Sequence, residues 1–340
     1  MIRLAERTYP EAARLARDPR SVVILPLGAV EQHGPHLPLL VDWLGAEALA
    51  QAVAPHLERA GYRVILAPAL PYGASPLAAR WPGTVSLTRA TLRRVIVEIV
   101  AGLAAHGFRR FVLANYQADP AHVRAMGEAK RALLRKRAAG GGRLEIQFAG
   151  FSPEASTRAA MLSPRVLRLS RSPRPAFEWH SGELETALVL ARRPELARRR
   201  MIRRLPPAWV DYRAALRKGA RTFEEIAPGG LGYFGWPAAA RAVTAERALR
   251  LRGQLMAREI LRAFGRPPAS AVRRARRGLW DETDSARPGS GPRGSDLPAP
   301  GVRRHGAWLD AVWYSQKPGI RLPRHHPPRR SQITRSSSSV

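Results

Sequence analysis

The chain has 340 residues, no cysteine and a formal net charge of +31 at neutral pH. The lack of cysteine excludes disulfide bonds and thiolate chemistry and fits a reducing compartment. The N-terminus has no apolar signal region, and no apolar stretch approaches the roughly 20 residues that cross a bilayer. We therefore expect a soluble, cytoplasmic protein with no membrane partner.

Short apolar stretches alternate with helical patterns along the first 265 residues. We predict strands at residues 22–27, 63–67, 110–114 and 145–149. Helical periodicity predicts helices at about 44–59, 88–106, 121–138, 183–192 and 244–264. Strands that alternate with helices of this length are typical of a parallel sheet covered on both faces. The sequence therefore predicts one three-layer α/β/α domain over residues 1–265.

Residues 266–340 differ from the rest of the chain in composition. Gly, Pro, Ser and Arg dominate, and the segment contains 15 Lys or Arg residues but only 5 Asp or Glu residues. Such a segment cannot bury enough apolar surface to offset the entropy of ordering it, so we expect a disordered basic extension. The arginines of residues 1–265 are scattered among alanines, without a known nucleic-acid module. We expect nucleic acid to bind only non-specifically.

The most informative stretch, residues 25–42, follows the first apolar run. It contains Glu31, His33 and Asp42 among several Gly and Pro residues. Glu31 and His33 are two positions apart, so in an extended segment their side chains leave on the same face. Carboxylates and imidazoles are ligands for Zn or Mn, and open α/β sheets bind ligands at the carboxyl ends of their strands. The stretch predicts a metal-hydrolase site; an ordinary solvated loop is the alternative.

Four segments together carry a family resemblance. Residues 26–39 with Asp42 resemble the opening motif of the creatinine amidohydrolase (creatininase) family, and residues 82–87 resemble its second landmark. Residues 180–186 are similar to its His-Ala-Gly-x-x-Glu-Thr segment. Residues 232–237, followed by 245–246, fit its last glycine-rich loop and terminal helix. The order and spacing agree over roughly residues 1–265, which is far more specific than one motif.

The resemblance implies an α/β fold and a binuclear metal centre that activates water to cleave a C–N amide bond. Carried over by position, Glu31 and Asp42 would hold one metal, and His33 and Asp42 the other. The family has two further ligands in the pattern Asn-x-His-x-Glu after the next core strand. Here Gln117 stands in place of the histidine and Asp119 in place of the glutamate.

These departures predict a mononuclear or asymmetric centre, with an inactive centre as the alternative. A glutamine carbonyl is a weak, neutral ligand, so the site that includes Gln117 should bind metal more weakly than its family counterpart. The site that includes Asp119 keeps a full oxygen and nitrogen set. We expect one or two divalent ions per protomer, Zn or Mn, with Fe as a further candidate. Many relatives also carry a Glu-His pair where this chain has Leu77 and Ala78, so either substrate choice differs from the family norm or catalysis has been lost.

Residues 179–185 contain two candidate catalytic groups. His180 is a candidate proton shuttle, because an imidazole titrates near neutrality and can protonate a leaving nitrogen. Glu185 could orient the water or support a metal ligand. In the alternative, Glu183 and Glu185 only complement the dipole of the helix that begins there. The resemblance favours the role of His180 and Glu185 in the site.

Three functions follow from these observations. The first is a metal-dependent amidohydrolase that cleaves a non-peptide C–N bond, a cyclic amide or formamide, in a small molecule. The second is a catalytically weakened or inactive relative that serves as a binding or assembly subunit. The third is a nucleic-acid-associated protein that uses its basic face. Family analogy also suggests a homo-oligomer, commonly a hexamer.

Overall fold

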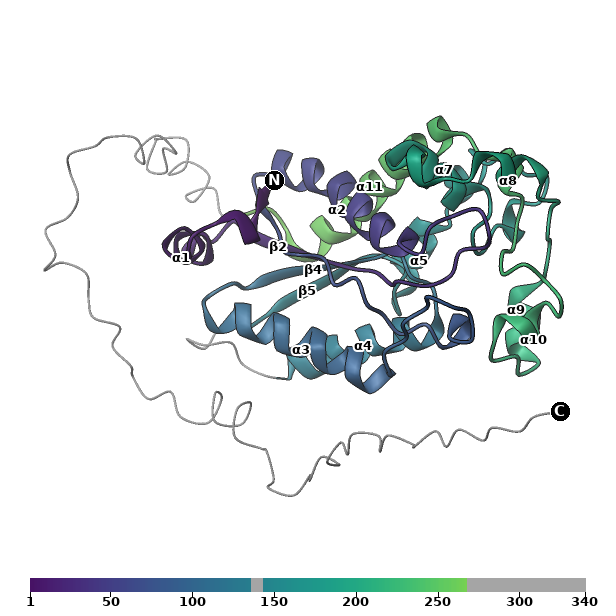
Figure 1. Ribbon diagram of the computed structural model, residues 1–340. Coiled ribbons are helices and arrows are strands. Elements are labelled where there is room, and N and C mark those ends of the chain that lie inside the picture. Colours follow the sequence, from purple (N-terminus) through teal and green to yellow (C-terminus); the bar gives the residue numbers. More distant parts are fainter. Residues whose placement is uncertain (136–142, 268–340) are drawn as a thin grey trace, which may run out of the picture. The chain divides into compact units, whose positions relative to one another are not determined.

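A five-stranded, wholly parallel sheet forms the centre of the domain. The computed structural model describes residues 1–135 and 143–267. The strands lie in the order β1-β3-β2-β4-β5 (Figure 1). Their bounds are β1 Ile2–Arg3, β2 Ser21–Leu27, β3 Arg63–Leu66, β4 Arg110–Asn115 and β5 Glu145–Gly150. All four predicted strands are confirmed, and β1 is an additional edge strand.

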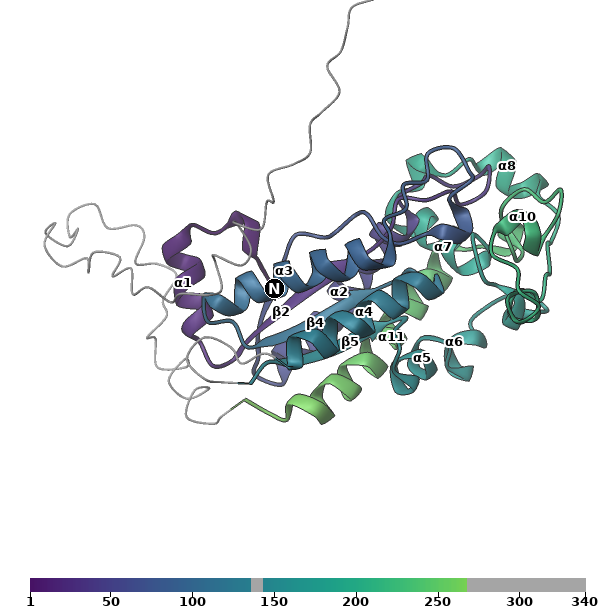
Figure 2. The same cartoon turned by 90° about the horizontal axis from the view of Figure 1, so that it is seen from below.

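Helices cover both faces of this sheet (Figures 1 and 2). The longer helices are α1 Tyr9–Arg17, α2 Val41–Arg59, α3 Arg89–Ala105, α4 Pro120–Leu134, α7 Glu183–Arg192 and α11 Ala242–Phe264. The short ones are α5 Ala155–Met161, α6 Pro164–Leu167, α8 Arg199–Arg204, α9 Tyr212–Arg217 and α10 Phe223–Ile226. Helices α3 and α4 pack on one face, and α2 and α11 on the other. The predicted three-layer α/β/α fold is confirmed.

Strand β2 lies in the middle of the sheet because every one of its residues can be buried. Val22 and Ile24 point into the apolar cluster beneath α2 and α11. Val23 and Leu25 point into the opposite cluster beneath α3 and α4. This alternation, with a period of two residues, explains why the strand reads as a continuous apolar run rather than an alternating one.

The structure differs from the predicted elements mainly at helix boundaries. Helix α2 begins at Val41 rather than near residue 44, which places Asp42 in the first turn of the helix instead of the loop before it. Helix α1 and the short helices between residues 155 and 226 were not predicted. The end of the helix predicted at 121–138 and the extension predicted at 266–340 lie largely outside the described residues.

No helix in residues 1–135 and 143–267 is both long enough and apolar enough to cross a membrane.

Candidate metal centre

The candidate site lies at the carboxyl edge of the two central strands. Strands β2 and β4 are hydrogen-bonded neighbours, and Leu27 at the end of β2 pairs with Asn115 at the end of β4. The loop after β2 carries Glu31 and His33, and the loop after β4 carries Gln117. Because parallel strands end at the same edge, the two loops meet there. The sheet register therefore brings together groups that are far apart in the sequence.

The segment before α7 supplies the other side of the site. The backbone of His180 pairs with Phe234, with an amide-to-carbonyl distance of 2.7 Å from Phe234 to His180. Ser181 follows with a φ of 55°, which lies in the left-handed region that residues other than glycine rarely adopt. Its backbone amide donates a hydrogen bond of 2.6 Å to the Glu185 carboxylate. This turn directs His180 and Glu185 into the same buried space.

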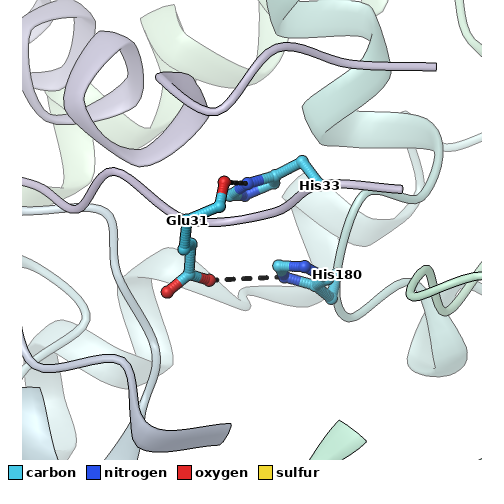
Figure 3. Close-up of side chains that lie close together, drawn as sticks. All are labelled: Glu31, His33 and His180. Atoms are coloured by element: carbon cyan, nitrogen blue, oxygen red, sulfur yellow. Dashed lines mark hydrogen bonds and ion pairs between the residues drawn. The ribbon is translucent and has the colours of Figure 1, made fainter. Parts of the chain in front are cut away.

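Glu31, His33 and His180 form the first group of potential ligands (Figure 3). The Glu31 carboxylate faces the His180 ring, with Oε1 3.8 Å from Nδ1. His33 Nδ1 lies 3.1 Å from the Glu31 backbone carbonyl, and the His33 and His180 ring centroids are 4.4 Å apart. His180 Nε2 lies 2.9 Å from the carbonyl oxygen of Gln32. One carboxylate and two imidazoles therefore lie close together.

His33, Asp42 and Glu185 form the second group. His33 Nε2 lies 3.8 Å from Asp42 Oδ2 and 3.7 Å from Glu185 Oε2. His33 is fully buried and Asp42 is only 2% exposed, yet His33 Nε2 and Asp42 Oδ2 have no hydrogen-bond partner within the described part of the chain. Buried polar atoms are normally paired, because leaving them unpaired costs free energy. A cation between these atoms would satisfy them, so the residues present fit a divalent metal.

The protonation equilibria of the site also fit a metal. Burial raises the pKa of Glu31 to about 8 and that of Glu185 to about 7, and it raises the pKa of Asp42 well above its usual range. The neighbouring carboxylates raise the pKa of Glu31 and Asp42 further. Burial lowers the pKa of His33 to about 4 and that of His180 well below its usual value. The imidazoles are therefore neutral donors of a lone pair, while burial disfavours the ionised carboxylates and a nearby cation would favour them.

Gln117 lies beside the first group but presents its amide nitrogen to it. Gln117 Nε2 donates to the Glu31 carboxylate, and it also lies 3.1 Å from Ser75 Oγ. Gln117 Oε1 accepts a hydrogen bond of 2.9 Å from the Asp119 backbone amide. This last bond fixes the orientation of the side-chain amide, since the flipped amide would place two donors face to face. The carbonyl oxygen of Gln117 is thus turned away from the site.

Asp119 lies at the N-terminus of α4, where it acts as the N-cap residue. Its Oδ1 accepts a hydrogen bond of 2.7 Å from the Ala121 amide, and its Oδ2 accepts one of 3.2 Å from the Leu77 amide. It belongs to neither group of potential ligands in the described residues. Burial raises its pKa to about 6. Five of the residues predicted for the site come together: Glu31, His33, Asp42, His180 and Glu185. Gln117 borders them, and Asp119 caps helix α4.

Glu183 and the buried His36 have structural roles in this arrangement. Glu183 accepts hydrogen bonds from the backbone amides of Arg171 and Ser172, so its carboxylate holds the preceding loop. His36 is fully buried, and its Nε2 lies 3.0 Å from both the Ser181 carbonyl and Thr186 Oγ1. These contacts support the turn that positions His180 and Glu185.

Sequence reasoning missed two residues that orient the site. Gln32 Nε2 lies 3.1 Å from His180 Nε2 and donates a hydrogen bond of 2.9 Å to the Gly232 carbonyl. Phe223 packs against His180 with a centroid separation of 4.6 Å. Gln32 lies inside the opening motif between Glu31 and His33, and this position could have marked it as a residue of the site. Phe223 lies in a region without a recognisable pattern, so no signal in the sequence marks it.

We expect the metal-free protein to lose stability as the pH rises from 6.5 to 8. Glu31 and Glu185 bind protons more tightly in the folded chain than in the unfolded chain, where their usual pKa is 4.5. The stability that their protonated forms contribute is therefore lost as the pH rises through the folded pKa values of about 8 and about 7. The buried His33 and His36 act in the opposite direction, but only below their usual pKa of 6.5.

Thermal unfolding of chelator-treated protein across this range measures the effect. We expect the unfolding temperature to fall by roughly 2–8 °C between pH 6.5 and pH 8. The Glu31→Gln variant, which cannot ionise at this position, should show a flatter profile. A wild-type unfolding temperature that stays constant or rises over this range would contradict the assigned direction of the carboxyl shifts.

Comparisons with known proteins identify the family to which the chain is related. The profile of the creatininase family, described as creatinine amidohydrolase, matches residues 5–260. Creatinine amidohydrolase of Pseudomonas putida is 32% identical over 222 residues, which cover 60% of this chain and 77% of that protein. Mycofactocin precursor peptide peptidase of Mycobacterium tuberculosis (strain ATCC 25618 / H37Rv) is 33% identical over 176 residues, which cover 49% of this chain and 66% of that protein.

Solved structures show the same fold. A crystal structure of creatinine amidohydrolase (creatininase) superposes with a TM-score of 0.60 at 28% identity and covers 79% of this chain and 99% of that one. A mutant creatininase described as the Zn-Zn type and a creatininase described as the Mn form match with TM-scores of 0.58 and 0.56, both at 28% identity. They cover 77% and 78% of this chain, and 98% and 99% of their own. The profile match over most of the described residues and the shared fold show that this chain belongs to the creatininase family.

Proposed function

We propose that the protein is a metal-dependent amidohydrolase that cleaves a non-peptide C–N bond in a small molecule, such as a cyclic amide or a formamide. One observation carries the proposal. His33 Nε2 and Asp42 Oδ2 are buried, unpaired within the described residues and aimed at each other beside Glu185. The family relatives support the class of reaction, since the Pseudomonas putida relative is a creatinine amidohydrolase.

The residues that would hold the metal are drawn from the two groups described above, which share His33. Zinc and manganese both suit a set of imidazole and carboxylate ligands, and related structures contain one or the other. A divalent metal in this position supplies a Lewis acid that polarises an amide carbonyl and lowers the pKa of water. Iron remains a further candidate on the same ligand chemistry.

His180 and Glu31 are the groups that would move a proton. Their facing atoms, His180 Nδ1 and Glu31 Oε1, are 3.8 Å apart. Carboxyl and imidazole groups are both common acids and bases in enzymes. We expect Glu31 to hold the proton and His180 to deliver it to the leaving nitrogen. The burial of both groups keeps bulk water away from this transfer.

The proposal is tested with the full chain loaded with zinc or manganese. The assay panel contains creatinine, a small lactam, an N-formyl amine and a short peptide, and the product is detected by mass spectrometry. We expect hydrolysis of a non-peptide amide that a chelator abolishes and added metal restores. Hydrolysis of the peptide alone would place the activity in another class. A folded, metal-loaded protein that cleaves nothing in the panel would contradict the proposed reaction.

Replacing His180 with asparagine tests the proton-transfer step. We expect kcat to fall by about 10²–10⁴-fold, the usual contribution of a positioned acid or base. Bound metal should be unchanged, because His180 is not needed for the second group of ligands. The control is His56→Asn, which changes a histidine that lies in α2 and contacts Arg59. A His180→Asn variant with unchanged kcat would remove this residue from the mechanism.

A second function is favoured by the orientation of Gln117. Its side-chain amide donates to the Glu31 carboxylate and offers no oxygen to the site. If this orientation weakens metal binding and catalysis, the protein could instead serve as a binding or assembly subunit. The Gln117→His variant separates the two functions. A variant that gains metal and activity over an inactive wild type would support the second function, and a wild type with its own activity would support the first.

A further inference from the structure

We infer that this centre holds a single divalent cation, ligated by His33, Asp42 and Glu185, and that Gln117 holds Glu31 out of the ligand set. The inference rests on the proposed metal dependence and specifies its ligands. It differs from the arrangement implied by the family motif, in which Gln117 and Asp119 would supply ligands and Glu185 would not. Four features of the site support it.

The first feature is the single free nitrogen of His33. Its Nδ1 lies 3.1 Å from the Glu31 carbonyl oxygen, which requires Nδ1 to carry the proton and donate it. Only Nε2 then offers a lone pair. Both groups of potential ligands include His33, so each needs the same nitrogen. A lone pair binds one cation, and the two groups therefore cannot both be filled. This hydrogen bond also fixes the ring orientation, as the second hydrogen bond of a metal-bound histidine commonly does.

The second feature is charge. The group of His33, Asp42 and Glu185 brings two carboxylates, which together neutralise a divalent cation. The group of Glu31, His33 and His180 brings one carboxylate and two neutral imidazoles. In a buried site, an uncompensated charge is costly. The group with two carboxylates is therefore the better match for a divalent ion.

The third feature is the number of ligand atoms that lack another partner. His33 Nε2 and Asp42 Oδ2 are both buried without a hydrogen bond among the residues that the structure describes. In contrast, the Glu31 carboxylate accepts from Gln117, which is itself held by Ser75 at 3.1 Å. This hydrogen bond occupies Glu31 Oε2 and leaves only Oε1, which faces His180, as a free ligand atom, so Glu31 offers a cation one carboxylate oxygen rather than two. Binding at His33 Nε2 and Asp42 Oδ2 breaks no hydrogen bond.

The fourth feature is the orientation of Asp119 and Glu185. Both carboxylate oxygens of Asp119 accept hydrogen bonds from backbone amides, of Ala121 and Leu77. Among the described residues, Glu185 accepts one backbone hydrogen bond, from the Ser181 amide to Oε2, and this oxygen lies 3.7 Å from His33 Nε2. Glu185 thus occupies the place of the third ligand. The shorter Asp119 side chain remains with the helix that it caps.

The test is a metal titration of the full chain with Co(II) and Zn(II). His305, His325 and His326 lie in the C-terminal segment and offer other ligands for metal. Bound metal is therefore counted as the amount that the His33→Gln variant loses. Co(II) adds a spectroscopic readout, because its visible absorption reports coordination by protein ligands independently of activity. Circular dichroism and unfolding temperature confirm that each variant is folded.

We expect one equivalent of metal that depends on His33 in the wild type. Glu185→Gln should weaken this binding by at least about 100-fold and remove the Co(II) absorption, although glutamine keeps an oxygen for the Ser181 amide. Asp119→Asn should bind metal as the wild type does, since asparagine also caps a helix. Glu195→Gln, at an exposed ion pair with Arg193, is the matched control and should leave binding unchanged. Gln117→His should bind one equivalent more in total than the wild type, and this additional equivalent should not depend on His33.

The outcomes separate this inference from the proposed function. Two equivalents in the wild type, or normal binding by folded Glu185→Gln together with loss in Asp119→Asn, would overturn the ligand assignment while leaving the metal-dependent hydrolase intact. No metal that depends on His33, even after reconstitution, would overturn both. One equivalent that Glu185→Gln loses and Asp119→Asn keeps would support the assignment, whatever the amide panel shows.

Discussion

Replacing Gly150 with alanine is expected to destabilise the domain by more than about 4 kcal/mol. Gly150 ends β5 with a φ of 96°, which a residue with a side chain rarely adopts. A Cβ atom placed there would lie 1.8 Å from the backbone oxygen of Asn115, far inside contact distance. The neighbouring strand β4 would have to move, and it carries the loop with Gln117. Chemical unfolding of the purified variant measures the loss.

Gly102→Ala is the matched control for this prediction. Gly102 lies inside α3, and an added Cβ there has no atom within 4 Å among the described residues. Alanine is the better helix former, so we expect a gain of about 0.5–1 kcal/mol. The two substitutions have the same chemistry and opposite expected signs. Equal effects at both positions would mean that the backbone of β5 tolerates a side chain at Gly150.

Replacing His33 with glutamine is expected to lower kcat/KM by at least about 10³-fold and to remove the bound metal. His33 is the member common to both groups of ligands, and it is fully buried. Glutamine fills a similar space and can still donate to the Glu31 carbonyl, but it lacks the imidazole lone pair. Elemental analysis and steady-state kinetics on the best substrate of the panel measure the two effects.

The fold should survive this change, which separates it from the Gly150 variant. The unfolding temperature of metal-free His33→Gln is expected to stay close to that of metal-free wild type. His56→Gln, at a histidine of α2 outside the site, should leave both metal and kcat/KM unchanged. Full activity of a folded His33→Gln protein would exclude the proposed centre.

The sequence predicts the sheet well because burial leaves a local signal. Strand β2 is apolar at nearly every position since both of its faces are covered, and the helices that cover it have the spacing of amphipathic helices. The short helices between residues 155 and 226 have no such signal. Helices of four to seven residues are stable only through the contacts around them, and those contacts are non-local.

The sequence predicts which residues gather at the site better than it predicts their partners. Glu31, His33 and Asp42 were predicted from one motif, and the structure brings them together with His180 and Glu185. The direction of a side-chain amide depends on a hydrogen bond to another loop, so the role of Gln117 could not be read from its position alone. For Asp119 a signal was present, because an Asp followed by Pro120 is typical of a helix start. The resemblance to the family motif favoured a ligand role for Asp119 over this capping role.

The antiparallel contact between His180 and Phe234 joins two segments that are far apart in the sequence, and it lies beside the candidate metal centre. His33 and Glu185 are likewise far apart in the sequence, so the unfolded chain contains no preformed site for a cation. Any ion that binds only the folded chain stabilises it by mass action, by about 2.7 kcal/mol when its free concentration is 100 times the dissociation constant. For the metal centre that we propose, the supply of zinc or manganese in the cell would then affect how long each copy of the protein escapes proteolysis. Metal starvation would lower the amount of protein as well as its activity.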